Sequence, residues 1–311
     1  MKNNIQLKKP KPWEARPTPN KDGTPSTFYV ETVLACNLGC PECAIGVDAI
    51  TRTKKIMKLE EFKIISKKIE PYAKLVFLHK WGEPFMNKNI FEMIKMTSEY
   101  AHAHISTNAH FLDGDRCEKT IKSGLGTLII SIDGMSQEVY EKYRVRGDVK
   151  LVIENIKRVA KTNEHYGKPV TILPQFIAFD HNYHEIGEFE DFCSSLGLRA
   201  IIKKPSIRFG KMEVSKDKKY HMEKYKNAKE HLDAISTCLH SDTIMAITAD
   251  GSLLLCTQDY NQGWSLGNLL DENVDVVKLW NNPLYKKIRD SIKNKQPPEI
   301  CTKKCWNYKR L

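Results

Sequence analysis

Short apolar segments alternate with amphipathic segments from residue 28 to residue 204, and this alternation constrains the fold more than any other feature. The expected strands are Phe28–Leu34, Lys74–Leu78, His102–Ser106, Thr127–Ile132, Thr171–Phe179 and Ala200–Lys204. The expected helices cover Lys58–Ile69, Ile90–Tyr100, a segment from Asp113, Lys150–Thr162 and Glu185–Leu196. Such alternation is typical of parallel sheets built from right-handed βαβ units. The sequence therefore predicts an α/β fold with a partial (β/α)6 TIM-like barrel, whose ligands bind at the carboxyl ends of the strands.

Three cysteines follow the first predicted strand within eight residues, as Cys36-x3-Cys40-x2-Cys43. Gly39 and Pro41 favour an irregular loop, which brings the thiols together only if it wraps around a bound group. Soft thiolates suit zinc or an iron–sulfur cluster. Three cysteines leave one iron of a [4Fe–4S] cluster open, whereas structural zinc normally has a fourth ligand nearby. The next downstream histidine is the distant His79, so the loop favours a cluster, with zinc as the alternative.

The same three cysteines, placed after a first strand, resemble the signature of the radical S-adenosylmethionine (SAM) enzymes. The resemblance implies that the open iron binds the amino and carboxylate groups of SAM. One electron then splits SAM into methionine and a 5′-deoxyadenosyl radical. After the second strand, the segment His79–Pro84 resembles the Gly-Gly-Glu-Pro element of the family, with Trp81 in place of the first glycine. Backbone carbonyls of this element accept hydrogen bonds from the SAM ammonium group.

The next strand ends continue the resemblance. Ser106-Thr107-Asn108-Ala109 is similar to the Thr-Asn-Gly element near the SAM ribose, with alanine in place of glycine. Ser131 and Asp133 lie at the end of strand four. In the loop that follows, either Arg144 or Arg146 matches a position that holds SAM. Strand five carries a glutamine that is expected near the adenine. Over residues 28–205, the resemblance implies SAM contacts from Trp81, Gly82, Glu83, Ser106, Asn108, Ser131, Asp133, Arg144, Arg146 and Gln175.

A second cysteine set begins beyond the barrel. Cys238-x12-Gly251-x4-Cys256 resembles the opening of the SPASM/twitch extension of the same family, and Cys301 and Cys305 follow. Asp250-Gly251 is a strong signal for a two-residue hairpin turn. Four thiolates close every iron of a second, auxiliary [4Fe–4S] cluster, while a four-cysteine zinc site is the alternative.

Three regions are therefore expected. They are an extended segment at 1–27, a core at 28–214, and a linker helix with a small β-hairpin-plus-helix cluster domain at 215–311.

Composition narrows the class of protein. The nine cysteines are clustered, which fits metal binding in a reducing cytoplasm better than disulfides. No apolar run is long enough for a membrane helix, and the first residues carry no secretory signal. The net charge is +11, but the lysines are spread out and no compact arginine-rich patch indicates nucleic acid. The resemblance implies a flavodoxin- or ferredoxin-type electron donor.

The reaction depends on the fate of the substrate radical. Oxidation passes an electron to the auxiliary cluster, whereas epimerisation takes a hydrogen from a thiol such as Cys117 or Cys193. Both thiols lie in predicted helices, where a buried cysteine also serves as a small hydrophobe. Substrate-facing candidates are Trp81, Tyr143, His181 and Gln258.

Three functions remain open at this point. Peptide-modifying relatives often carry an amino-terminal recognition domain, and residues 1–27 are too few to form one. We therefore expect oxidation or epimerisation of a small sugar, aminocyclitol or anionic metabolite, with peptide modification second. An RNA-binding or iron–sulfur scaffold protein is third, because it would not need the strand-end motifs.

Overall fold

The computed structural model describes residues 17–221, 228–236, 238–264, 266–303 and 305. Its strands are β1 (Thr27–Val30), β2 (Leu75–Phe77), β3 (His102–Thr107), β4 (Thr127–Ser131), β5 (Thr171–Ile177), β6 (Ile201–Lys203), β7 (Ile244–Ile247) and β8 (Leu253–Leu254). Its α-helices are α1 (Leu59–Ile69), α2 (Ile90–Ser98), α3 (Gly114–Lys122), α4 (Gln137–Tyr143), α5 (Val149–His165), α6 (Ile186–Ser195), α7 (Ala228–Ser236), α8 (Leu239–Asp242), α9 (Val276–Trp280), α10 (Pro283–Lys293) and α11 (Glu299–Lys303). Short 3-10 turns cover Pro84–Met86, Tyr183–Glu185 and Lys218–Tyr220.

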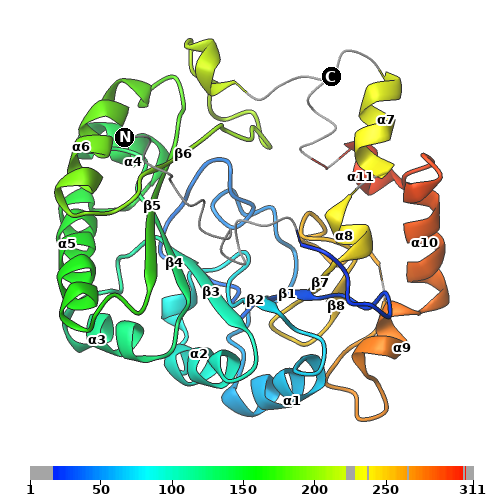
Figure 1. The fold of residues 1–311 in the computed structure, drawn as a ribbon. Coiled ribbons are helices and arrows are strands. Elements are labelled where there is room, and N and C mark those ends of the chain that lie inside the picture. Colours follow the sequence, from blue (N-terminus) through cyan, green and yellow to red (C-terminus); the bar gives the residue numbers. More distant parts are fainter. Residues whose placement is uncertain (1–16, 222–227, 237, 265, 304, 306–311) are drawn as a thin grey trace, which may run out of the picture.

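The strands form one curved sheet in the order β6-β5-β4-β3-β2-β1-β7-β8. Strands β1 to β6 pair in parallel, each with the next, and α1 to α6 cover the convex side (Figure 1). The sheet does not close on itself, so the predicted α/β fold with a partial barrel is confirmed. Helix α4 was not predicted; it fills the connection between β4 and α5.

The predicted carboxyl-terminal hairpin is formed by β7 and β8 and extends the barrel sheet. Strand β7 pairs in parallel with β1, from Thr27 opposite Ile244 to Val30 opposite Ile247, and β8 pairs antiparallel with β7. Helices α9 and α10 lie beyond β8 (Figure 1). As a result, β1 is an interior strand with a barrel neighbour on one side and the hairpin on the other.

Helix faces follow the apolar periodicity of the sequence. In α1, Phe62, Ile65 and Ile69 are buried at the spacing that places them on one face. Helix α5 begins at an Asp148 cap, whose side chain accepts a hydrogen bond from the backbone N–H of Leu151 at 3.2 Å.

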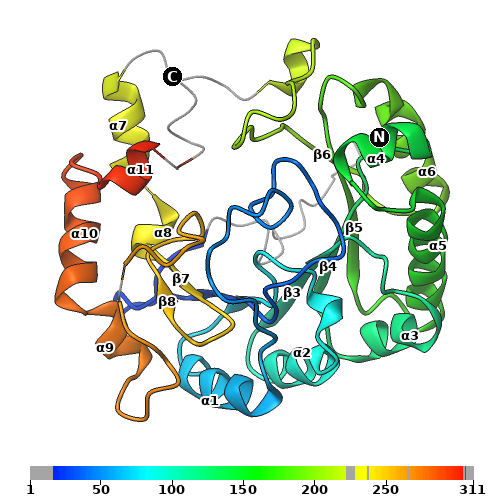
Figure 2. The same cartoon turned by 180° about the vertical axis from the view of Figure 1, so that it is seen from behind.

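The loop between β1 and α1 lies inside the curve of the sheet (Figure 2). Strand β1 ends at Val30, earlier than predicted, because the chain then pairs with the returning arm of the same loop. The N–H of Leu34 donates to the carbonyl of Lys55 at 2.7 Å, and Val33 forms a bridge with Ile56. The apolar residues after Val30 therefore anchor the cysteine loop rather than prolong the strand.

Two predicted segments lie partly outside the described residues. Residues 1–16 belong to the expected extended segment, and residues 222–227 belong to the expected linker helix, of which α7 is described. Among the helices that the structure describes, none is both long enough and apolar enough to cross a bilayer.

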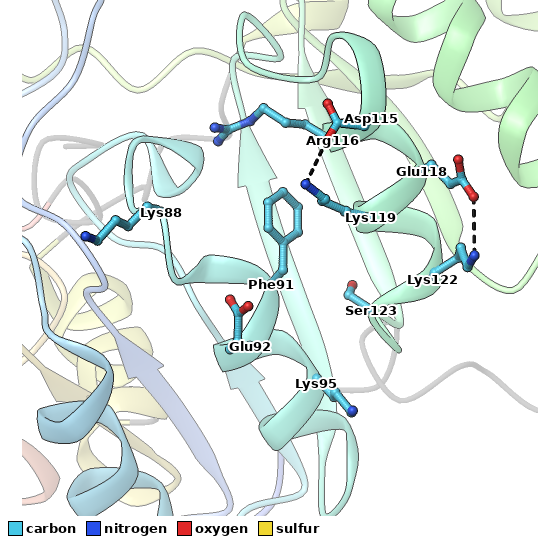
Figure 3. Close-up of a pocket in the computed structure, with 10 residues that line it drawn as sticks. All are labelled: Lys88, Phe91, Glu92, Lys95, Asp115, Arg116, Glu118, Lys119, Lys122 and Ser123. Atoms are coloured by element: carbon cyan, nitrogen blue, oxygen red, sulfur yellow. Dashed lines mark hydrogen bonds and ion pairs between the residues drawn. The ribbon is translucent and has the colours of Figure 1, made fainter.

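The groove between α2 and α3 has a volume of about 660 Å³, and none of the predicted site residues lines it (Figure 3). Its charged side chains pair along the helix, as in Lys119–Asp115 at 2.7 Å and Lys122–Glu118 at 3.3 Å. Exposed pairs of this kind are typical of a solvated helix surface.

A buried ion pair joins the two halves of the sheet near the end of β1. The fully buried carboxylate of Glu31 receives two hydrogen bonds from Arg52, at 2.8 and 2.9 Å. Glu31 also accepts from the N–H of Ala249, just after β7, at 3.1 Å. The Arg52 Nε donates to the carbonyl of Tyr260 at 2.7 Å. These contacts tie the cysteine loop to the hairpin.

We expect Arg52→Met to lower the free energy of unfolding by about 3–5 kcal/mol, because it leaves the Glu31 charge buried without a cation. Urea unfolding of the reduced apoprotein measures the effect. Lys63→Met, which removes the exposed pair with Glu60, is the control and should leave stability almost unchanged. The double variant Glu31→Gln/Arg52→Met should recover part of the loss. An Arg52→Met protein as stable as the control would contradict the assignment.

Candidate active site

The loops at the carboxyl ends of β1 to β4 meet in one cavity of about 310 Å³. All three cysteines of the first motif line it. So do seven residues that the resemblance assigns to SAM: Trp81, Gly82, Glu83, Ser106, Asn108, Ser131 and Arg144. The substrate-facing candidate Tyr143 lines the cavity as well, whereas His181 and Gln258 do not.

The first cysteine set is surrounded by hydrogen-bond donors. The Sγ of Cys36 accepts from the N–H of Leu38 at 3.4 Å and from the Nδ2 of Asn108 at 3.8 Å. The Sγ of Cys40 accepts from the Nη1 of Arg144 at 3.7 Å. Burial raises the pKa of Cys40 to about 11, and the charge of Arg144 opposes this rise. Donors and a cation beside the sulfur favour the thiolate, which is the form that binds iron.

Gly82 explains why the second strand end reaches the cysteine loop. A Cβ at this position would lie 2.1 Å from the carbonyl oxygen of Val33 and 2.7 Å from that of Ala35. The N–H of Glu83 donates to the same Ala35 carbonyl at 2.8 Å. Only a residue without a side chain permits this approach, so the Gly-Glu-Pro turn and the cysteine loop form one unit.

The Glu83 carboxylate joins this turn to the end of β3. It accepts hydrogen bonds from the Thr107 hydroxyl at 2.7 Å, the Asn108 N–H at 2.8 Å and the Phe85 N–H at 3.1 Å. Burial raises the pKa of Glu83, and these donors oppose the rise. Asn108, held in this way, donates its amide to Asn37 at 2.8 Å. Glu83 thus positions the wall of the cavity.

Asp133 and Arg144 form a buried pair beside the cysteine loop. The Arg144 Nε donates to Asp133 at 2.5 Å, and the other Asp133 oxygen accepts from the Ile177 N–H at 2.6 Å. Burial raises the pKa of Asp133, while the charge of Arg144 lowers it. Of the two arginines that the sequence left open, Arg144 is the one that lines the cavity.

Arg146 and Gln175 are placed differently. Arg146 is exposed and lies outside the cavity lining, against Gly39, where an added Cβ would be 3.3 Å from its Nη2. Gln175 lies opposite Ser131 in the β4–β5 pairing and is buried, but it is not part of the cavity lining.

Glu42 is a site residue that the sequence did not reveal. In the sequence it lies between Cys40 and Cys43. Its buried carboxylate accepts hydrogen bonds at 2.6 to 3.0 Å from four backbone N–H groups, those of Arg208, Phe209, Lys211 and Met212. The loop after β6 is therefore tied to the cysteine loop and brings Arg208 into the cavity wall. The only sequence signal is a carboxylate inside a metal-binding motif, and it does not identify its partner.

The second cysteine set gathers beyond the hairpin. Cys238 precedes α8, Cys256 follows β8, Cys301 lies in α11, and Cys305 follows it. Burial raises the pKa of Cys256 to about 12, and the nearby Cys238 and Cys305 add to the rise. Burial also raises the pKa of Cys301, and the nearby Cys256, Cys238 and Cys305 add to that rise. The four thiols therefore converge on one region.

Among the described residues, no three Cys, His, Asp or Glu side chains are grouped as a single metal ion requires. The first cysteine set is instead supported by the cavity that its three cysteines line and by the donors to its sulfurs. The second set is supported by the mutual electrostatic effects of its thiols.

Cys117 and Cys193 lie apart from this region. Both are buried in the apolar core that the outer helices α3 and α6 form with the sheet. The Cys117 thiol donates to the Thr162 hydroxyl at 3.5 Å. Neither residue lines the cavity, so their expected role as hydrogen donors gains no support from their position.

Residues 30–189 match the model of the radical SAM superfamily, and residues 238–306 match that of the SPASM iron–sulfur cluster-binding domain. The first match spans half of the chain, and this protein belongs to the radical SAM superfamily. It is a radical SAM enzyme with a SPASM-type carboxyl-terminal domain, and it uses SAM, a SAM-binding [4Fe–4S] cluster and an auxiliary cluster.

Two relatives illustrate the range of the family. S-adenosyl-L-methionine-dependent 2-deoxy-scyllo-inosamine dehydrogenase of Niallia circulans is 22% identical over 291 residues, covering 91% of this chain and 93% of that protein. Probable GTP 3′,8-cyclase of Methanocaldococcus jannaschii is 29% identical over 168 residues, covering 52% of this chain and about half, 53%, of that protein.

The fold also resembles that of Streptococcus suis SuiB bound to S-adenosylmethionine. The TM-score is 0.66 at 15% identity, covering 86% of this chain and 68% of SuiB.

We predict that fully reconstituted protein binds about eight irons per chain, four for each cluster. Cys40→Ala and Cys256→Ala should each bind about four, because each removes a ligand of one cluster. Cys117→Ser is the matched control and should keep about eight. Iron and zinc analysis after anaerobic reconstitution measures this. Four irons with one bound zinc in the parent protein would replace the auxiliary cluster by a structural zinc site.

Proposed function

We propose that this enzyme abstracts a hydrogen atom from a small polar substrate, such as a sugar, aminocyclitol or anionic metabolite, and oxidises the resulting radical. The observation that carries the proposal is the cavity beside the cysteine loop, whose lining includes polar side chains and the cations Lys80, Arg144 and Arg208. The Niallia circulans relative, which aligns along 93% of its length, is a 2-deoxy-scyllo-inosamine dehydrogenase, and this supports the substrate class.

The residues present fit the cofactors. Cys36, Cys40 and Cys43 would hold the open cluster, and Cys238, Cys256, Cys301 and Cys305 the closed one. When bound, the open cluster and SAM supply a 5′-deoxyadenosyl radical, and the closed cluster is an electron acceptor. A flavodoxin- or ferredoxin-type protein is the proposed external electron donor.

The side chains of the chain orient and shield these groups. Arg144 and Asn108 donate to the cysteine sulfurs, and Gly82 allows the turn after β2 to approach the backbone carbonyls of Val33 and Ala35 at the start of the cysteine loop. Ser106 and Ser131 present hydroxyls at the ends of β3 and β4, where they are suited to the SAM ribose. The loop from Arg208 to Met212, fixed by Glu42, contributes Arg208 to the wall of the cavity.

Oxidation is favoured over epimerisation because of where the remaining thiols lie. Epimerisation needs a hydrogen donor beside the substrate radical, and Cys117 and Cys193 are buried in the helical layer. The hairpin that leads to Cys256 of the second cysteine set, by contrast, extends the sheet beside the strand that carries the cysteine loop, because β7 pairs with β1.

The test is anaerobic turnover of reconstituted protein with a reductant and SAM. We expect formation of 5′-deoxyadenosine, accelerated by the true substrate in a panel of deuterated aminocyclitols, sugars, sugar phosphates and peptides. Deuterium should appear in 5′-deoxyadenosine, and the substrate should gain a carbonyl group. Cys36→Ala should abolish cleavage of SAM.

Cys117→Ser and Cys193→Ser are the matched controls and should keep their turnover. Protein that holds both clusters but never cleaves SAM would contradict the proposed SAM-dependent hydrogen abstraction. Loss of turnover in either control would support epimerisation with that thiol as the hydrogen donor. Deuterium transfer from peptides alone would indicate a peptide maturase.

A further inference from the structure

Two cations lie close to one indole ring in the wall of the cavity. The Nζ of Lys80 lies 4.0 Å from the centre of the Trp81 ring, and the guanidinium carbon of Arg208 lies 5.4 Å from it. Lys80 comes from the loop after β2, and Arg208 from the loop that Glu42 holds. All three residues line the cavity.

The indole ring is fixed, and its polar atom needs an acceptor. Trp81 is 6% exposed and packs edge-on against Tyr260 at 5.6 Å, next to Leu34 and Phe209. Its Nε1 is buried and has no hydrogen-bond partner among the residues that the structure describes. An indole N–H is a donor only, so a missing partner here points to an acceptor supplied by a ligand.

Bringing two cations together in a partly buried place is unfavourable unless negative charge compensates them. Burial and the charge of Arg208 lower the pKa of Lys80 to about 7, while Cys256, Glu31 and Cys43 act in the opposite direction. The carboxylate among these groups, Glu31, already receives two hydrogen bonds from Arg52. It is therefore a weak source of compensation for Lys80.

The electrostatic partners of Lys80 also locate the pair. Cys43 belongs to the first cysteine set and Cys256 to the second, and both act on Lys80. The residues proposed for the SAM ribose, Ser106 and Ser131, lie at the ends of β3 and β4 instead. Lys80 is thus within electrostatic reach of both cysteine sets, as expected of a group that binds a substrate between SAM and the electron acceptor.

We propose that Lys80, Arg208 and the Trp81 indole N–H bind an anionic group of the substrate, a carboxylate or a phosphate, while SAM occupies the rest of the cavity. This inference rests on the proposed function and narrows its substrate class to small anionic molecules. Two cations and one neutral donor match the several acceptor oxygens of such a group.

The experiment measures binding of inorganic phosphate, with acetate in parallel, to the holoenzyme with both clusters, by anaerobic calorimetry. It is done with and without saturating SAM. We expect Lys80→Met and Arg208→Gln each to weaken phosphate binding about tenfold or more, since each removes a charge-assisted contact. Trp81→Phe keeps the ring and removes the N–H, and it should weaken binding about fivefold. Lys211→Met is the matched control, because this exposed lysine lies on the same loop and should bind phosphate normally.

Saturating SAM should leave phosphate affinity unchanged. Phosphate that binds equally well to the two charge variants, or not at all to the parent protein, would overturn the inference. Competition between SAM and phosphate would assign the cations to the SAM carboxylate and also overturn it. The SAM-cleavage assay separates the two proposals: holoenzyme that cleaves SAM but lacks this anion site refutes only the anion site, whereas holoenzyme that cannot cleave SAM refutes the proposed function.

Discussion

Strand β1 is hydrogen bonded along both edges, and the rest of the site depends on this constraint. Its barrel neighbour β2 and the hairpin strand β7 both run parallel to it, so three carboxyl ends open at the same edge of the sheet. The cysteine loop leaves from the central one, and Glu31, directly after the strand, is bonded to both Arg52 and Ala249. Because the two halves of the chain share one sheet, the β7–β8 hairpin, which Cys256 follows, lies beside the strand from which the cysteine loop leaves.

Buried carboxylates then fix the loops that surround the cavity. Glu83 binds the end of β3, Asp133 binds Arg144, and Glu42 binds four backbone N–H groups of the loop after β6. Glu185 does the same for the start of α4, accepting from the Met135 N–H and the Ser136 hydroxyl. Loops carry many backbone donors that a sheet cannot satisfy, and a carboxylate accepts several of them at once. Hydrogen bonds to buried carboxylates, rather than helices or strands, therefore fix the loops around the cavity.

The sequence was sufficient for the parts that depend on local patterns. Strand and helix periodicity predicted β1 to β6 and the partial barrel, and the positions of polar residues after each strand predicted most of the cavity lining. Pairing between β1 and β7 could not be predicted, because a parallel pairing across more than 200 residues leaves no local signal. Glu42 and Arg208 were missed for the same reason, since each acquires its role from a partner far along the chain. Cys117 and Cys193 were singled out by chemistry, but their helical positions place them in the apolar core.

We infer that the first cysteine set leaves one iron open, whereas the second set closes its cluster. Electron paramagnetic resonance of the reduced, reconstituted protein, with and without SAM, distinguishes the two clusters. We expect two cluster signals: one shifts when SAM binds and disappears in Cys40→Ala, and the other is unaffected by SAM and disappears in Cys256→Ala. A single signal, or two signals that both shift with SAM, would contradict it.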